Sequence, residues 1–250
     1  MIKIFRNARK RLLNEGKTSS YLKYAIGEIV LVMIGILLAL QINNWNEDSK
    51  KSTLRIKYLS SLVEDLKQDT AMIAGQHQFY KEDTLKLSSQ IARIKKHKNI
   101  DTIKNIARHE FDITVQLITA FSNKTYQTLI NTGNIDLIDP WLVEELSKLD
   151  QLQKLTVDIY KFSMESYSQT STVYNQQLPF KDDALAGKLL DGLWENINKS
   201  DFLAKYNQML TSKITIGGNV ILILPPIYKQ TESLLKKILL EYPELSSGNK

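Results

Sequence analysis

One stretch of the sequence, from Tyr24 to Trp45, constrains the chain most, because it is long and apolar enough to cross a lipid bilayer. It reads YAIGEIVLVMIGILLALQINNW. As an α-helix it would be about 31 Å long, which matches a hydrocarbon core of about 30 Å. Tyr21, Tyr24 and Trp45 lie where interfacial aromatic residues are expected. The pattern predicts a transmembrane helix over residues 24–45, with a buried helix of a soluble domain as the alternative.

Positive charge is concentrated before this stretch. Residues 1–23 hold seven Lys or Arg and one Glu, whereas the two signs balance in the rest of the chain. This bias predicts a cytoplasmic N-terminus and an extracytoplasmic region over residues 46–245. Apolar and basic side chains segregate within residues 1–14, which favours an amphipathic segment attracted to anionic lipid headgroups rather than to nucleic acid. A basic flank without a helix and a cleaved signal peptide are the alternatives.

Four residues fall on one face of the predicted transmembrane helix. At about 100° per residue, they lie within about 20° of one line; they are Glu28, Gly35, Ala39 and Asn46. Gly35 and Ala39 form a small-xxx-small pair, which lets two helix backbones approach closely. We expect this membrane stripe to pack against a second copy or a partner helix. Alternatively, Glu28 reaches for water or pairs with Lys23 near the membrane edge.

Helical periodicity continues beyond the membrane. Apolar residues recur at seven-residue intervals from Leu59 to Ile94. They predict a long helix over residues 47–98, and polar companion positions favour a partly exposed bundle helix over a strict coiled coil. Helical spacing predicts a second helix over residues 103–121. A third is predicted over residues 140–177, with a leucine-rich buried side that extends to Phe162 and a later half, rich in Ser, Thr, Gln and Tyr, that is exposed or lines a groove.

The remaining elements are also predicted to be helical. A break at residues 178–180 precedes a helix capped by Asp182 or Asp183, and a further helix begins near Ser200. Residues 213–228 fit a kinked helix better than a β-hairpin, although Gly217-Gly218 would suit a turn. Residues 246–250 are expected to form a disordered tail. The fold class is therefore all-α: an N-terminal transmembrane helix followed by an antiparallel bundle of long helices.

Two stretches resemble a family of uncharacterised bacterial single-pass membrane proteins: YAIGEIVLV with IGILLALQINNWNE, and TYQTLINTGNIDLI. The resemblance implies a short basic N-terminus, one span and a helical extracytoplasmic region in the inner membrane of Gram-negative bacteria. It implies no activity or ligand. Within the second stretch, Tyr126, Leu129 and Gly133 are expected to fix a tight corner between helices, with a docking site as the alternative.

Motifs for chemistry are lacking. The three histidines have no metal-ligand spacing, there is no cysteine, and no nucleotide-binding glycine motif occurs. We therefore expect no enzyme, cofactor or metal site. The sequence favours a membrane-anchored interaction or scaffold protein whose partner is a second copy or another envelope protein. The alternative is a periplasmic ligand-sensing module that acts through a partner, which a polar pocket near residues 163–177 would favour.

Overall fold

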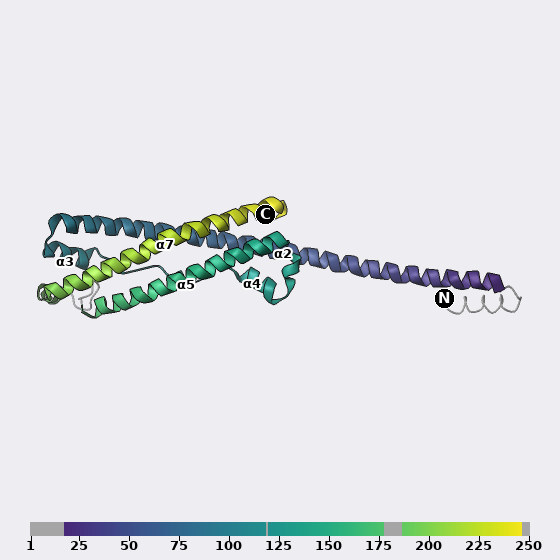
Figure 1. Ribbon diagram of the computed structural model, residues 1–250, viewed down its shortest axis with the longest axis horizontal. Coiled ribbons are helices and arrows are strands. Elements are labelled where there is room, and N and C mark those ends of the chain that lie inside the picture. Colours follow the sequence, from purple (N-terminus) through teal and green to yellow (C-terminus); the bar gives the residue numbers. More distant parts are fainter. Residues whose placement is uncertain (1–17, 119, 178–186, 247–250) are drawn as a thin grey trace. The chain divides into compact units, whose positions relative to one another are not determined.

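The computed structural model describes residues 18–118, 120–177 and 187–246, and this part of the chain contains helices and turns but no strand (Figure 1). The all-α prediction is confirmed. In chain order the elements are α2 (Thr18–His97), α3 (Ile100–His109), α4 (Lys124–Asn131), the 3₁₀ helix η1 (Asn134–Leu137), α5 (Pro140–Gln177), α6 (Lys188–Glu195), α7 (Lys199–Glu241) and the 3₁₀ helix η2 (Pro243–Ser246). The predictions for residues 1–17, 178–186 and 247–250 lie outside the described residues.

Helix α2 is continuous and contributes to two compact units, one up to Lys57 and one from Tyr58 onward. In the first unit, large apolar side chains from Leu22 to Ile42 are exposed. The helix is long and apolar enough to cross a membrane, and 0% of its most apolar window is buried. Helix α7 also passes that test, but 33% of its window is buried. The exposed apolar stretch of α2 suggests that this helix anchors the chain in a membrane.

The second unit is a bundle of three long helices: α2 from Tyr58 onward, α5 and α7. The apolar stripe predicted on α2 lies in the core of this bundle. Its first five residues are buried: Leu59, Leu66, Ile73, Tyr80 and Leu87. Helix α7 runs antiparallel to α5, because Asn219 lies near Ser163 while Tyr242 lies near Asp139. Helices α2 and α5 run in the same direction (Figure 1).

The helix predicted over residues 103–121 is wrong in its second half. Helix α3 ends at His109, and the chain continues as an irregular connecting segment, residues 111–123 without Thr119. Phe111, Ile113 and Val115 face the core while the residues between them are exposed. This alternation is that of an extended chain, whose side chains point to opposite sides in turn. The segment returns the chain along the bundle, so that α2 and α5 are parallel.

An extended segment among helices has no ladder to satisfy its backbone groups, and side chains take this role. Three residues of α2, spaced by seven and then fourteen positions, contribute. Asp69 accepts from the Ser122 amide (2.6 Å), and Gln76 donates to the Leu117 carbonyl (3.3 Å). Gln90 donates to the carbonyl of Glu110, the residue directly before the segment (3.1 Å). The polar positions beside the apolar stripe were expected to be partly exposed. In the structure they face inward and form a polar seam along α2.

Helix α5 contributes in the same way. The hydroxyl of Tyr160 donates to the Gln116 carbonyl and that of Tyr167 donates to the Ile113 carbonyl. Tyr80 of α2 reaches the same Gln116 carbonyl (2.8 Å). The buried face of α5 therefore passes through Tyr160 and Tyr167, and Phe162, predicted to be buried, is 76% exposed.

Residues 213–228 belong to the interior of α7, so the β-hairpin alternative is excluded. Pro225 and Pro226 are exposed, which lets water reach the carbonyls that lose an amide partner to the two prolines. A Cβ atom on Gly217 would lie 3.3 Å from Thr84 Oγ1 of α2. The first glycine of the pair thus serves close packing of α7 on α2 rather than a turn.

Lys213 joins three parts of the bundle, and we expect its replacement to destabilise the fold. The side chain is 1% exposed; its Nζ lies 3.2 Å from Asp83 Oδ1 and donates to the Asp112 carbonyl. Removing one member of a buried pair costs about 3–5 kcal/mol. Asp83 keeps 15% side-chain exposure, so Lys213→Met should lower the unfolding free energy by about 3 kcal/mol. Denaturant titration of the full chain in detergent, followed by far-UV circular dichroism, measures this.

The matched control is Lys236→Met, on the same helix. Lys236 pairs with Glu232 at 3.0 Å but is 66% exposed. An exposed pair contributes less than about 1 kcal/mol, so the control should unfold almost as the parent does. Equal loss in both variants would contradict the role given to Lys213.

Candidate functional site

The membrane stripe predicted from the sequence lies on the first unit's part of α2. Gly35, Ala39 and Asn46 are exposed and Glu28 is half-buried. A Cβ atom at Gly35 would meet nothing within 4 Å. Trp45 is 74% exposed, whereas the side chains of Tyr21 and Tyr24 lie outside the described part. Gly35, Ala39 and Asn46 lie on a part of the helix face that is exposed, and the packing role of all four positions stays a prediction.

The predicted corner residues lie in and just after α4. Tyr126 and Leu129 are buried, at 8% and 0% exposure. Gly133 adopts φ +70°, a left-handed conformation that residues with a side chain rarely adopt. Its amide donates to the Ile130 carbonyl at 3.2 Å, which closes the end of α4. The motif thus combines two core anchors with the turn that leads toward α5.

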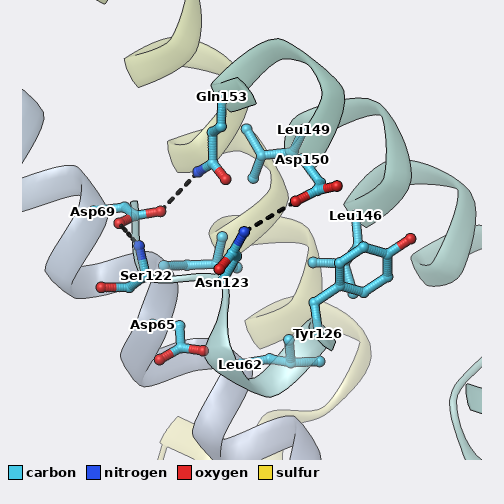
Figure 2. Close-up of a pocket in the computed structure, with 11 residues that line it drawn as sticks. Leu62, Asp65, Asp69, Ser122, Asn123, Tyr126, Leu146, Leu149, Asp150 and Gln153 are labelled. Carbon is cyan, nitrogen blue, oxygen red and sulfur yellow. Dashed lines mark hydrogen bonds between the residues drawn. The ribbon is translucent and has the colours of Figure 1, made fainter. Parts of the chain in front are cut away.

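A polar cluster, formed by Asp65, Asp69, Asn123, Asp150 and Gln153, surrounds the start of α4 (Figure 2). Asp65 accepts from the Thr125 amide at 3.0 Å, so a carboxylate of α2 caps α4. Asn123, the N-cap residue, makes no side-chain cap of its own and instead donates to Asp150 at 3.0 Å. Gln153 donates to Asp69 at 2.7 Å. The cluster therefore fastens α4 to α2 and α5.

The polar cluster encloses too little space for an organic ligand. Its cavity of about 20 Å³ is the size for a single water. Burial raises the pKa of Asp69 above the ordinary 3.8, against the bonds from Ser122 and Gln153, which favour the charged form. Among the described residues no group of three or more His, Cys, Asp or Glu is arranged to hold a metal ion. The cluster's chemistry is structural.

A larger open groove of about 630 Å³ lies between α5 and α7. Ser163, Ser166 and Thr170 line it from α5. Helix α7 supplies a second polar wall, made of Asn207, Gln208, Thr211, Ser212, Thr215 and Asn219. Three apolar side chains complete it: Ile159, Phe162 and Ile216. No charged side chain lines the α5/α7 groove, and its volume is large enough for a small molecule.

The sequence indicated the groove only in part. The low apolar content of residues 163–177 indicated exposure or a groove. The wall on α7 spans the end of the helix predicted from Ser200 and the start of residues 213–228, whose conformation was open, so no polar face was predicted there. Asn207, Thr211 and Thr215 recur at helical spacing, which would have marked a polar face once residues 199–241 were taken as one helix.

Comparison with known proteins gives one match. A family model described as a family of unknown function, DUF6090, matches residues 28–144. The matched span includes three of the features above: the membrane stripe, the connecting segment and the corner at α4. No curated protein and no solved structure matches the chain. The match agrees with an uncharacterised family and carries no activity.

Replacing Asp69 should change the pH dependence of stability. Because its folded pKa is raised, Asp69 stabilises the fold fully below about pH 3.8, and this contribution is lost as pH rises through the folded pKa. Asp69→Asn can keep both hydrogen bonds if the Gln153 amide rotates. We therefore expect Asp69→Asn to gain stability relative to the parent as pH rises through that window. Denaturant midpoints of both chains test this. They are measured from about pH 3 to about pH 7, the range in which carboxyl groups in folded proteins usually titrate.

Asp69→Ala is the control. It also removes the titrating group, so its stability should follow the pH trend of Asp69→Asn, but about 1–3 kcal/mol lower at every pH because the partly buried Ser122 amide loses its acceptor. A constant difference between Asp69→Asn and the parent across the series would refute the assignment.

The conformation of Gly133 predicts opposite effects for two glycines. Gly133→Ala forces a side chain into the left-handed region and should cost about 1–2 kcal/mol. Gly218→Ala, inside α7 with nothing within 4 Å of the new Cβ, should stabilise by up to about 1 kcal/mol. Thermal unfolding of the full chain in detergent measures both. Loss of stability in both variants, or in neither, would go against this reading of the corner.

Proposed function

We propose that the chain is a membrane-anchored helical interaction protein of a bacterial inner membrane, with its N-terminus in the cytoplasm and its bundle in the periplasm. The observation that carries this is the first unit of α2, whose large apolar side chains are exposed from Leu22 to Ile42. Lipid is the environment that such a surface needs. The basic bias of residues 1–23 supports the orientation.

Self-association through the membrane stripe is the interaction we propose first. Helices in lipid gain little from apolar burial, so close packing at small residues and hydrogen bonds between polar ones decide whether they pair. Gly35 and Ala39 supply the close approach, and Glu28 and Asn46 supply polar groups near the two ends of the span. A second copy presents the same four residues, which makes the stripe self-complementary in a two-fold pair.

Ligand sensing through a partner is the second candidate, and the α5/α7 groove favours it. The groove has the volume of a small-molecule site and includes part of the stretch of α5, residues 163–177, where a polar pocket would favour this function. In this second candidate function, a partner protein relays the signal across the membrane.

An introduced cysteine tests association and orientation together, since the chain has no cysteine of its own. Asn46→Cys places one thiol on the stripe at the proposed periplasmic edge. The periplasm is oxidising, so paired copies should form a disulfide-linked dimer in cells without added oxidant. Adding Gly35→Ile should reduce that dimer at least about tenfold, because a bulky side chain separates the backbones. Non-reducing gels of membranes measure the dimer.

Gly27→Ile is the matched control: it makes the same change on the same helix, one residue from Glu28 and so about 100° away from it. It should leave the dimer within about twofold of the parent. Equal dimer in Gly35→Ile and Gly27→Ile would refute pairing along the stripe. A dimer that forms in isolated membranes only after oxidant is added would keep the pairing and refute the periplasmic placement.

A further inference from the structure

We propose that the α5/α7 groove binds a neutral, polyhydroxylated ligand, a saccharide chain. This rests on the ligand binding that the second proposed function requires, and names the ligand class. The hydrogen-bonding state of the groove walls and the charge of its lining carry the proposal. Phe162, which lies beside the hydroxyl-bearing positions, adds a third observation.

Three hydroxyl groups in the groove have their protons engaged within their own helix and present lone pairs to the groove. Ser163 donates its proton to the Ile159 carbonyl at 3.0 Å, Thr170 to the Ser166 carbonyl at 3.1 Å, and Thr215 to the Thr211 carbonyl at 2.9 Å. A hydroxyl whose proton is used in this way can still accept hydrogen bonds. A ligand that meets these oxygens must therefore donate protons.

The amides of the α7 wall have donors to offer as well. Asn207 and Gln208 are exposed, and Asn219 reaches across to Ser163 at 3.5 Å. Each amide side chain carries both donor and acceptor groups. The ligand must therefore accept as well as donate, as the hydroxyl groups of a sugar do at every position.

Charge excludes the other common ligand classes. The lining holds no Lys, Arg or His, so a carboxylate or phosphate would lose water without gaining a counter-charge. It holds no Asp or Glu either, so an ammonium ligand meets the same cost. A carboxylate also lacks the protons that these Ser and Thr oxygens would accept.

Phe162 gives the groove an apolar platform. The side chain is 76% exposed in the bundle, although phenylalanine is usually buried. A sugar ring has an apolar C–H face and a polar hydroxyl rim. The C–H face can stack on the Phe162 ring while the hydroxyl rim forms hydrogen bonds with the neighbouring Ser and Thr side chains. The groove is open along the two helices, which suits a chain of sugar units rather than a single enclosed ring.

The test is saccharide binding to the full chain in lipid nanodiscs. The probes are a neutral β-linked N-acetylglucosamine oligomer, a neutral glucose oligomer and a sulfated oligosaccharide, titrated by isothermal calorimetry. We expect saturable binding of at least one neutral oligomer and none of the sulfated one. Phe162→Ala and Thr170→Val should each weaken it at least about tenfold, which is roughly the effect of losing one good contact.

Two surface variants on α5 outside the groove lining are the matched controls. Leu155→Ala removes an exposed apolar side chain (57% exposed) and Thr172→Val removes an exposed hydroxyl. Both should bind within about twofold of the parent, and circular dichroism should show all four variants folded alike.

Three outcomes would overturn the proposal. Absence of binding by both neutral oligomers refutes the ligand class, and a small-molecule screen on the same nanodiscs then decides separately whether the chain senses another ligand. Binding that Phe162→Ala and Thr170→Val leave unchanged refutes the site. A disulfide-linked dimer through Thr170→Cys would show that a second copy of this chain occupies the groove instead.

Discussion

The bundle depends on one constraint: an extended segment runs among helices, and its backbone carbonyls must find donors there. Buried backbone groups that lack a partner cost free energy comparable to a lost hydrogen bond. The donors come from side chains of α2, α5 and α7, including Gln76, Tyr160 and Lys213. This explains why polar residues occupy inward positions at seven-residue spacing. In an ordinary coiled coil, polar residues at such inward positions of α2 and α5 would destabilise the packing. Here they supply the hydrogen bonds that the connecting segment would receive from a neighbouring strand in a sheet.

The same constraint determines which faces remain for function. Tyr160 and Tyr167 turn inward to reach the connecting segment, and on a helix of 3.6 residues per turn this places the positions of Ser163, Ser166 and Thr170 at the side that meets α7. Phe162 is then carried out of the core although its residue type favours burial. The α5/α7 groove is thus a consequence of how α5 uses its tyrosines. The leucine-rich start of α5 packs in the usual apolar way and has no such groove.

The sequence predicts those elements whose signal is local. Asp139-Pro140 marks the start of α5, and the Leu59 to Leu87 repeat marks the core face of α2. The connecting segment was missed because Phe111, Leu117, Ile118 and Phe121 fit helical spacing, while the competing alternation of Phe111, Ile113 and Val115 spans few residues. The partners of Asp69 and Gln90 lie 53 and 20 positions away. Periodicity treats such polar residues as exposed, so the polar cluster and half of the groove could not be foreseen from one sequence.

The two proposed functions differ in whether the bundle must change its conformation. Ligand sensing requires such a change, whereas attachment to a partner does not. A ligand shifts a conformational equilibrium only as far as it binds one state better than the other. The groove walls belong to α5 and α7, and both helices are held to the connecting segment by hydrogen bonds that a rearrangement would have to break. A saccharide that bridges the two walls would meet the same arrangement before and after binding. Recognition in the groove would therefore position the bundle on its ligand rather than switch it, and the membrane helix would supply the second attachment point. On this reasoning the two proposals combine into one proposed tethering role, in which the groove would hold the ligand and the membrane helix would hold the bilayer.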